Sequence, residues 1–300
     1  MQYLKGIIPI VNTTFREDGS LDLDSQRRLV QHLIGQGVHA IALFGNAGEG
    51  YALMESERDE LMSAIIREIR GKVPVVVSTG HSGTDAAIQI SRAAEIAGAD
   101  ALMILPPSFL KPDSQSIFTY FAAISNAVRI PIMVQDAPLM TQVSMPSSLI
   151  ARMGRELEHI EYAKIEAPPT APKITELVTE ADGSIAAFGG LNGNFLIEEL
   201  DRGSQGIMPG SDLCAAFVHI WDLYQNGDRV AARAEFRRYL PLIRYELQPG
   251  LGVSVMKHNL AAQGVIACAR VRHPTRTLDA IGIREISELR SEITTNIGSV

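Results

Sequence analysis

The stretch VPVVVSTGHSGTDAAIQISRAAEIAG, residues 73–98, holds one complete repeat of the pattern that decides the fold of this chain. It begins with a short apolar run rich in valine, which is typical of a buried β-strand. Its second half, from Asp85, is a longer segment in which apolar residues recur at helical spacing. The stretch therefore predicts one strand followed by one helix.

The same order recurs along most of the 300 residues. The clear strand candidates are GIIPIV (6–11), HAIALFG (39–45), VPVVVSTG (73–80), DALMILPP (100–107) and IPIMVQDAP (130–138). Others follow at looser spacing, namely IEYAKIEAPP (160–169), SIAAFGGLNG (184–193) and QGIMPGSD (205–212). Near-continuous apolar strands that alternate with helices indicate parallel pairing, and eight of them close into a barrel. We therefore expect an α/β fold, a TIM (β/α)8 barrel.

The alternation stops near Asp228. Only helical patterns follow, in DRVAARAEFRRYLPLIRYEL (228–247), GLGVSVMKHNLAAQGV (250–265) and DAIGIREISELRSEI (279–293). No linker rich in proline or serine separates these helices from the barrel, so we expect them to pack on it. The predicted organisation is a barrel catalytic domain over residues 1–226 and a C-terminal helical extension over residues 227–300.

The composition favours a small molecule as the partner of this protein. The formal net charge is −7 and 20% of the residues are charged, which gives no electrostatic reason to expect nucleic acid or an anionic membrane. Cys214 and Cys268 lie in apolar helical patterns, which predicts neither a disulfide framework nor a cysteine metal cluster. The first residues become polar too soon for a signal peptide or a membrane span. We expect a cytoplasmic protein.

In a TIM barrel, the functional side chains lie at the carboxyl ends of the strands and on the loops that follow. The positions to consider are Asn12, Thr13 and Thr14, the GNAGEG loop (45–50), Ser78, Thr79 and His81, Gln135 and Asp136, Lys164 and Glu166, Gly189 and Gly190, and Pro209, Gly210 and Ser211. No spacing of histidine, aspartate and glutamate among them suggests a metal site.

Lys164 is the most informative of these residues. The other lysines of the chain fall at the terminus, in turns or on amphipathic helices, where we expect them to be solvated. The two-residue period of a strand puts Lys164 and Glu166 on one side of the sheet. A buried ammonium must either pair with a carboxylate or work as a neutral amine, which attacks carbonyls to form a Schiff base. We predict the nucleophile, and an ion pair with Glu166 is the alternative.

Other positions carry weaker signals. The N–H groups of the GNAGEG loop could bind a carboxylate or a phosphate. A tight turn also needs glycines for its own conformation, and the loop sequence taken by itself favours this second explanation. Glu49 is either an acid–base group or a buried, hydrogen-bonding carboxylate. His81 either acts on a substrate hydroxyl or has no catalytic role. Ser211 either binds a phosphate or caps a helix.

Together these residues resemble the class I aldolase superfamily that includes dihydrodipicolinate synthase and N-acetylneuraminate lyase. The resemblance is carried by GNAGEGYAL.ESER (45–58), PIMVQDAP (131–138), AKIEAP (163–168), GIMPG (206–210) and K..L...G (257–264). It implies a barrel that acts on pyruvate or another 2-keto acid through a lysine Schiff base, without a further cofactor. By this resemblance Lys164 is that lysine, the backbone around Asn46 and Ala47 holds the substrate carboxylate, and the protein is a homotetramer or homodimer.

We accordingly predict a site without metal. The predicted catalytic residues are Lys164, Gln135 and Asp136, and the predicted substrate-binding residues are Gly45, Asn46, Ala47, Ser78, His81, Glu166, Gly190, Ile207 and Pro209.

The chain departs from the synthases at four places that matter for proton transfer and substrate binding. Gln135 stands where synthases and sialic acid lyases have a tyrosine, and Phe109 stands at the second relay tyrosine. Met140 replaces the arginine that grips the semialdehyde carboxylate, and Asn46 with Ala47 replaces a hydroxyl pair. The resemblance therefore does not extend to dihydrodipicolinate synthesis.

The pair IMVQDAP and KIE.P resembles the branch that contains L-2-keto-3-deoxyarabonate dehydratase, although the AGEG loop is nearer to the general lyase form. In such an enzyme the lysine condenses with the C2 ketone, the iminium acidifies C3, and loss of the C4 hydroxyl leads to a semialdehyde. We expect Gln135 and Asn46 to orient substrate hydroxyls. Water and the nearby polar groups would transfer protons, the candidates being Asp136, Ser78, His81 and Glu49.

Two other functions stay open on the sequence. A retro-aldolase would use the same lysine and release pyruvate, but it needs a base on the C4 hydroxyl, which is the usual role of the missing tyrosine. A catalytically silent barrel could bind a keto acid as a regulator, because a fold does not determine a function. Retention of Lys164 argues against the silent barrel.

Overall fold

The computed structural model describes residues 4–295. Two compact units form within the chain, and each is built from two separate segments. Within the described residues, one unit contains Pro74–Met208 together with Leu4 and Lys5, and the other contains Gly6–Val73 together with residues 209–295. The predicted domain boundary after residue 226 stays a prediction.

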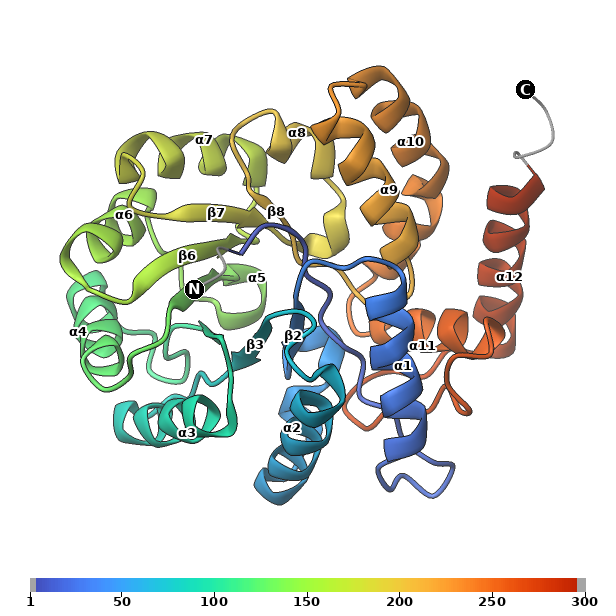
Figure 1. Cartoon of the computed structure of the whole chain (residues 1–300), viewed down its shortest axis with the longest axis horizontal. Helices are drawn as coiled ribbons and strands as arrows, with labels where there is room; N and C mark the ends of the chain where they lie inside the picture. Colours follow the sequence, from blue (N-terminus) through green and yellow to red (C-terminus); the bar gives the residue numbers. More distant parts are fainter. Residues whose placement is uncertain (1–3, 296–300) are drawn as a thin grey trace. The chain divides into compact units, whose positions relative to one another are not determined.

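The first unit is a run of parallel strands, each followed by at least one helix. Its strands are β3 (Val75–Ser78), β4 (Ala101–Ile104), β5 (Ile132–Asp136), β6 (Ile160–Ile165), β7 (Ala186–Gly189) and β8 (Gly206–Ile207). Its helices are α3 (Thr84–Ala97), α4 (Ser114–Ser125), α5 (Pro138–Thr141), α6 (Ser147–Glu156), α7 (Thr170–Ala181) and α8 (Leu196–Leu200), and η3 (Leu191–Gly193) is a short 3-10 turn. Each strand from β3 to β7 pairs in parallel with the next one in the chain. In Figure 1, α6 and α7 lie outside β6 and β7, against which they pack.

The register of β5, β6 and β7 decides which side chains share a face. Lys164 pairs with Gln135 on one side and with Phe188 on the other. Ile165 pairs with Asp136 and with Gly189 in the same way. Because partners in adjacent strands point to the same face and neighbours in one strand point to opposite faces, Gln135 lies with Lys164 and Asp136 lies on the other face.

The second unit begins with two short strands. They are β1 (Gly6–Ile7) and β2 (Ile41–Leu43). A backbone hydrogen bond of 2.9 Å, from Ala42 N–H in β2 to Pro9 O, connects β2 to the segment that follows β1. The predicted strand over residues 6–11 is shorter than expected, with Ile10 forming only an isolated bridge to Ala42. Pro9 explains the interruption, because proline has no N–H to donate to a strand ladder.

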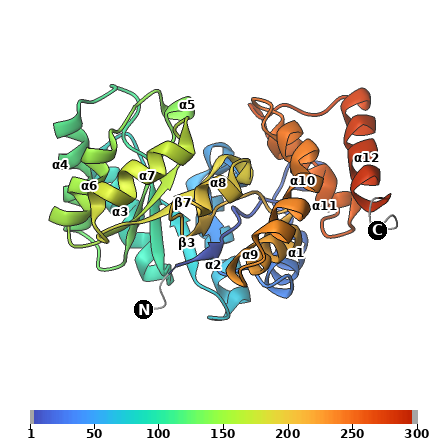
Figure 2. The same ribbon diagram turned by 90° about the horizontal axis from the view of Figure 1, so that it is seen from above.

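The rest of the second unit is helical. Its elements are α1 (Leu23–Gly35), the 3-10 turns η1 (Asn46–Gly48) and η2 (Gly50–Ala52), α2 (Glu55–Ile69), α9 (Cys214–Gln225), α10 (Arg229–Glu246), α11 (Gly252–Ala262) and α12 (Ala280–Thr295). Figure 2 shows α9 to α12 following one another, with α10 packed on α9, α11 and α12. Leu242, Val255 and Ile286 form an apolar core between the last three helices.

The predicted fold class is confirmed: the protein is a TIM (β/α)8 barrel with a C-terminal helical extension. The strands and helices expected from the sequence are present within residues 4–295, and the short helix α5 and the 3-10 turns were not predicted. A helix of one turn, such as α5, is too short to show a hydrophobic period. Over residues 4–295, the structure contains no helix with the length and apolar character that crossing a membrane requires.

Candidate active site

Lys164 and Glu166 lie together at the end of β6. The Lys164 side chain is buried, with 4% of the residue exposed, and its Nζ lies 3.4 Å from Glu166 Oε1. That distance is within reach of an ion pair but longer than a tight charge-assisted hydrogen bond, which measures about 2.7–2.9 Å. The alternative that the sequence left open, a contact with Glu166, is therefore present, and it does not exclude the nucleophile.

Glu166 is held in place from two directions. Its Oε2 accepts a hydrogen bond of 2.7 Å from Gln135 Nε2, and its Oε1 accepts one of 3.3 Å from the Leu191 N–H. Gly190 provides the room for this carboxylate, since a Cβ at that position would lie 2.3 Å from Glu166 Cγ. The predicted residues Gln135, Lys164, Glu166 and Gly190 thus form one cluster.

Asp136 lies apart from this cluster, on the other face of β5. Its carboxylate is fully buried, and Oδ2 forms an ion pair of 2.6 Å with Lys173 Nζ from α7. Burial raises the pKa of the Asp136 carboxyl, although Lys173 acts in the opposite direction. The structure thus places Asp136 where it joins β5 to α7, and its catalytic role stays a prediction.

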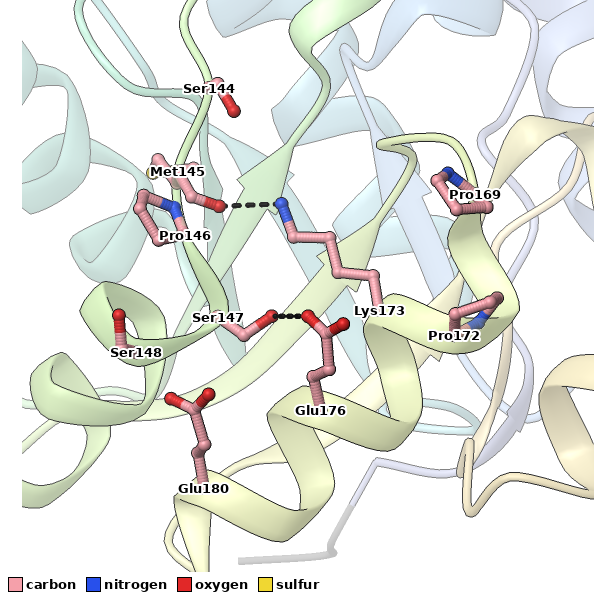
Figure 3. A pocket seen from close by; sticks show the side chains of 10 residues that line it. All are labelled: Ser144, Met145, Pro146, Ser147, Ser148, Pro169, Pro172, Lys173, Glu176 and Glu180. Atoms are coloured by element: carbon pink, nitrogen blue, oxygen red, sulfur yellow. Dashed lines mark hydrogen bonds between the residues drawn. The ribbon is translucent and has the colours of Figure 1, made fainter.

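Lys173 also borders a pocket on the helical side of the first unit. Figure 3 shows its Nζ donating to Met145 O over 2.6 Å and Ser147 Oγ donating to Glu176 Oε2 over 3.3 Å. The pocket has a volume of about 320 Å3 and contains none of the predicted site residues in its lining. Its lining is mixed, with prolines, serines, one lysine and two glutamates, Glu176 and Glu180.

The remaining predicted residues of the first unit lie at the ends of two strands, β3 and β8. Ser78 ends β3 and is half-buried, and Ile207 in β8 is fully buried and pairs with Gly189. His81 is exposed, and its Nδ1 accepts a hydrogen bond of 2.9 Å from Gly83 N–H within its own turn. The backbone oxygen of His81 accepts from Tyr120 Oη over 3.0 Å. These contacts anchor the turn, and the role of His81 toward a substrate stays a prediction.

The GNAGEG loop lies in the second unit, as the 3-10 turns η1 and η2. Gly45 and Ala47 are buried and Asn46 is exposed. Two hydrogen bonds fix the loop backbone, one of 2.7 Å from Asn12 Nδ2 to Ala47 O and one of 2.6 Å from Thr13 Oγ1 to Gly48 O. Two side chains of the second unit therefore anchor the loop.

Pro209 and Ser211, which follow β8, form hydrogen bonds with the segment after β1. Pro209 is buried, and its oxygen accepts from Ile10 N–H over 2.8 Å. Ser211 Oγ donates to Ile10 O over 2.9 Å and accepts from Asn12 N–H over 3.1 Å. Ser211 is not the cap of α9, a place that Leu213 takes. Its hydroxyl instead holds the end of the first strand.

Glu49 is a buried, hydrogen-bonding carboxylate, which is one of the two alternatives that its sequence position allowed. It is fully buried and forms an ion pair with Lys257, which is also fully buried. Arg272 N–H and Thr275 Oγ1 donate to its other oxygen over 2.8 and 3.2 Å. A carboxylate with these partners serves the packing of this loop against the C-terminal residues.

The expectation that every lysine except Lys164 is solvated is wrong for two of them. Lys257 is fully buried beside Glu49, and only 15% of the Lys173 side chain is exposed beside Asp136. For Lys257 a signal was present in the apolar residues Val253, Val255 and Met256, which precede it on α11. For Lys173 the sequence offers no signal of burial, because its partner Asp136 belongs to another strand–helix repeat.

Comparison with known proteins places the chain in a family. The model of the Dihydrodipicolinate synthetase family matches residues 3–292, nearly the whole chain. The chain belongs to this family.

Relatives in the dihydrodipicolinate synthetase family include enzymes with different names. The chain is 37% identical to the L-2-keto-3-deoxyarabonate dehydratase of Azospirillum brasilense, over 90% of this chain and 88% of that protein. It is 27% identical to a 4-hydroxy-tetrahydrodipicolinate synthase of Chlorobium chlorochromatii, over 95% and 96% of the two chains. The crystal structure of dihydrodipicolinate synthase from Rhodopseudomonas palustris superposes with a TM-score of 0.91 at 30% identity, covering 96% of this chain and 97% of that one.

The positions at which the chain departs from synthases of this family have different surroundings. Gln135 is 3% exposed and bound to Glu166, whereas Phe109 is 83% exposed and Met140 is 47% exposed. Of these three side chains, Gln135 is the one bonded to a residue of the Lys164 cluster.

Proposed function

We propose that this protein is a Schiff-base-forming dehydratase of a 2-keto-3-deoxy sugar acid, of the L-2-keto-3-deoxyarabonate type. The observation that carries the proposal is the cluster in which Glu166 contacts Lys164 and is held by Gln135 instead of a tyrosine. The 37% identity to a dehydratase of that name supports it. The substrate would be a small 2-keto acid, and neither a metal nor a cofactor beyond the covalent lysine enters the proposal.

The first step is condensation of Lys164 with the substrate ketone. The neutral amine of Lys164 attacks C2, a C–N bond forms, and the ketone oxygen leaves as water, which gives an iminium. Glu166 Oε1, 3.4 Å from Lys164 Nζ, is placed to accept the ammonium proton that must leave before the amine can attack.

The second step is elimination. The iminium withdraws electrons from C3, so that a base can remove a C3 proton and produce an enamine. The enamine expels the C4 hydroxyl, which takes up a proton and leaves as water. Rearrangement of the remaining double bond and hydrolysis of the C–N bond then release the semialdehyde and regenerate the lysine. Overall one water is lost and the carbon chain stays intact.

We assign the proton transfers to Glu166. Among the carboxylates considered for this role, Asp136 is paired with Lys173 and Glu49 is paired with Lys257. Glu166 instead contacts the reactive amine itself and has two hydrogen-bond donors that fix its orientation. A fixed carboxylate at reacting distance is what general acid–base catalysis requires.

The neighbouring residue favours elimination over carbon–carbon cleavage. A retro-aldolase must remove the proton of the C4 hydroxyl, and the amide of Gln135 has no proton that titrates in water. Gln135 can donate a hydrogen bond to a substrate oxygen or hold Glu166, but it cannot act as that base. Release of pyruvate is therefore the competing outcome in the experiment below.

Other parts of the prediction carry over to the proposal unchanged. The GNAGEG loop, with Asn46 and Ala47, is predicted to bind the keto-acid carboxylate, and its fixed backbone suits such a role. Oligomeric state as a homotetramer or homodimer and a cytoplasmic location also stay predictions.

Trapping of the Schiff base tests the proposal directly. The protein is incubated with pyruvate or a keto-deoxy acid, reduced with borohydride, digested and examined by mass spectrometry. We expect an adduct on the peptide that contains Lys164, and none on that peptide in Lys164→Arg, while Lys173→Arg keeps the adduct. A wild-type protein without adduct would refute the enzyme and leave the silent barrel. The reaction products are then identified across a panel of keto-deoxy acids. A semialdehyde with the intact carbon chain indicates a dehydratase, and released pyruvate indicates an aldolase.

A further inference from the structure

Glu199 is a buried carboxyl that the proposed mechanism does not use. It lies on α8 and is fully buried. Its Oε1 accepts a hydrogen bond of 2.6 Å from Thr170 Oγ1 at the start of α7. Its Oε2 is also buried and has no hydrogen-bond partner among residues 4–295. Ionisation of Glu199 in this position would cost free energy, because Oε2 would carry negative charge without a hydrogen-bond donor.

Two consecutive glycines separate Glu199 from the Lys164 cluster. A Cβ at Gly189 would lie 1.7 Å from Glu199 Oε2, and a Cβ at Gly190 would lie 2.3 Å from Glu166 Cγ. Neither glycine has a positive φ, so the backbone conformation does not require them. The room that each one leaves is filled by a carboxyl group, Glu199 beside Gly189 and Glu166 beside Gly190.

The two carboxyls approach this segment from opposite faces. Gly189 pairs with Ile165 and therefore shares its face, whereas Lys164 and Phe188 point to the other face. Glu199 thus lies on the helix side of β7, away from the reactive amine. It can influence Glu166 only through the backbone of Gly189 to Leu191, whose last N–H donates to Glu166 Oε1, and through its electric charge.

The surroundings of Glu199 favour its protonated form. The charged groups that act on it are Glu166 from the end of β6 and Glu198 from its own helix, and both are acidic. Thr170, from α7, offers only a hydroxyl. Burial and these two carboxylates raise the pKa of Glu199 to about 7, against the effect of the Thr170 hydrogen bond.

We propose that Glu199 is a positioning residue of the Lys164 site that works as a neutral carboxylic acid filling the space beside Gly189. Its ionisation would place a second negative charge behind Glu166. That charge favours the ammonium form of Lys164, which cannot attack a carbonyl, and it forces an unpaired anion against the strand. The consequence for catalysis rests on the proposed function, whereas the protonation state of Glu199 does not.

The pH dependence of folding tests the protonation without any assay of activity. A carboxyl whose folded pKa lies above its unfolded value of 4.5 stabilises the protein fully below 4.5, and this contribution is lost as the pH rises toward 7. Glu199→Gln mimics the neutral acid and cannot lose a proton. We expect the urea midpoint of wild type to fall between pH 5 and pH 8 relative to that of Glu199→Gln, and the exposed control Glu180→Gln to follow wild type. Parallel curves for wild type and Glu199→Gln would overturn the proposal.

The effect on the site is read from the rate of Schiff-base trapping with pyruvate. Wild type and Glu199→Gln should react equally fast at pH 5.5, and Glu199→Gln should react several-fold faster above pH 8. Equal rates at both pH values would show that Glu199 does not act on Lys164. If wild type forms no adduct at any pH, the proposed function fails while the folding experiment still decides the state of Glu199.

A second variant covers the case in which Glu199→Gln does not fold. Thr170→Val removes the hydrogen bond that lowers the pKa of Glu199, so the fall in stability should move to higher pH. Infrared spectra offer a direct reading, because a buried protonated carboxyl absorbs apart from carboxylates. We expect this band in wild type at pH 6, its loss by pH 9, and a higher transition pH in Thr170→Val. Absence of the band at pH 6 would overturn the proposal.

Discussion

Gln135 Nε2 donates a hydrogen bond of 2.7 Å to Glu166 Oε2, so the residue at the position where synthases are expected to have a tyrosine holds the carboxylate beside Lys164. A tyrosine at this place would bring a phenol that can exchange a proton, whereas an amide only fixes a direction. In the proposed mechanism, proton transfer is therefore assigned to Glu166, the residue that follows β6.

Loss of the Gln135 side-chain amide should weaken catalysis without unfolding the barrel. Gln135→Leu keeps a similar volume but removes the donor, which leaves Glu166 less fixed. A hydrogen bond to a charged group contributes about 1.5–3 kcal/mol, so we expect kcat to fall by roughly 10- to 100-fold. Steady-state kinetics of semialdehyde formation measure the change. A kcat equal to that of wild type would show that Gln135 does not orient Glu166.

Removal of the Glu166 charge should separate the two chemical steps. Glu166→Gln cannot accept the C3 proton, and general acid–base catalysis typically contributes about 100- to 10,000-fold, so turnover should fall by that order. Borohydride trapping with pyruvate should remain detectable, though slower, because Lys164 is intact. Glu161→Gln on the same strand β6 is the matched control and should leave both readouts unchanged. Full turnover in Glu166→Gln would assign the base to another group.

A methyl group at Gly190 should displace Glu166. Gly190→Ala puts a Cβ within 2.3–2.7 Å of three atoms of that side chain, so the carboxylate must turn away from Lys164. We expect a loss of turnover close to that of Glu166→Gln and a much smaller loss of thermal stability. Gly35→Ala in α1, where nothing lies within 4 Å of the added carbon, is the control. Normal turnover in Gly190→Ala would contradict the placement of Glu166.

The ion pair between Asp136 and Lys173 should matter for stability rather than for chemistry. Lys173→Met leaves a fully buried carboxyl without its partner, and breaking a buried pair costs about 3–5 kcal/mol. The double variant Asp136→Asn with Lys173→Met should recover part of that loss. Urea unfolding of wild type, the two single variants and the double variant would measure the recovery. Additive losses would mean that the two side chains do not interact.

The stability of Lys173→Met should also depend on pH. The pKa of Asp136 is raised by burial in the folded protein, so the stability that this group contributes is present below its unfolded value of 3.8 and declines as the pH rises above it. Lys173 limits that decline in wild type, because it favours the charged form. We therefore expect the unfolding midpoint of Lys173→Met to fall more steeply than that of wild type from pH 4 upward. An identical slope would contradict the pairing.

Much of this protein follows from patterns along the chain. Local periodicity predicts the strands and helices, because a helix or a strand repeats its apolar residues every 3.6 or two positions and needs no distant partner to do so. The two-residue period also places Lys164 and Glu166 on one side of β6, and the structure confirms their contact. The family resemblance could be recognised on short motifs for the same reason, since each motif is local.

Tertiary structure decided which charged groups pair. Lys257 and Glu49 are 208 residues apart, and no pattern in either segment names the other as its partner. Asp136 follows Gln135 directly along the chain, but the register of β5 against β6 puts the two side chains on opposite faces. The proximity of Glu199 to Gly189 likewise depends on how α8 packs against α7 and β8. A sequence shows where charges lie along the chain, and only packing determines which of them lose their water and must find a partner.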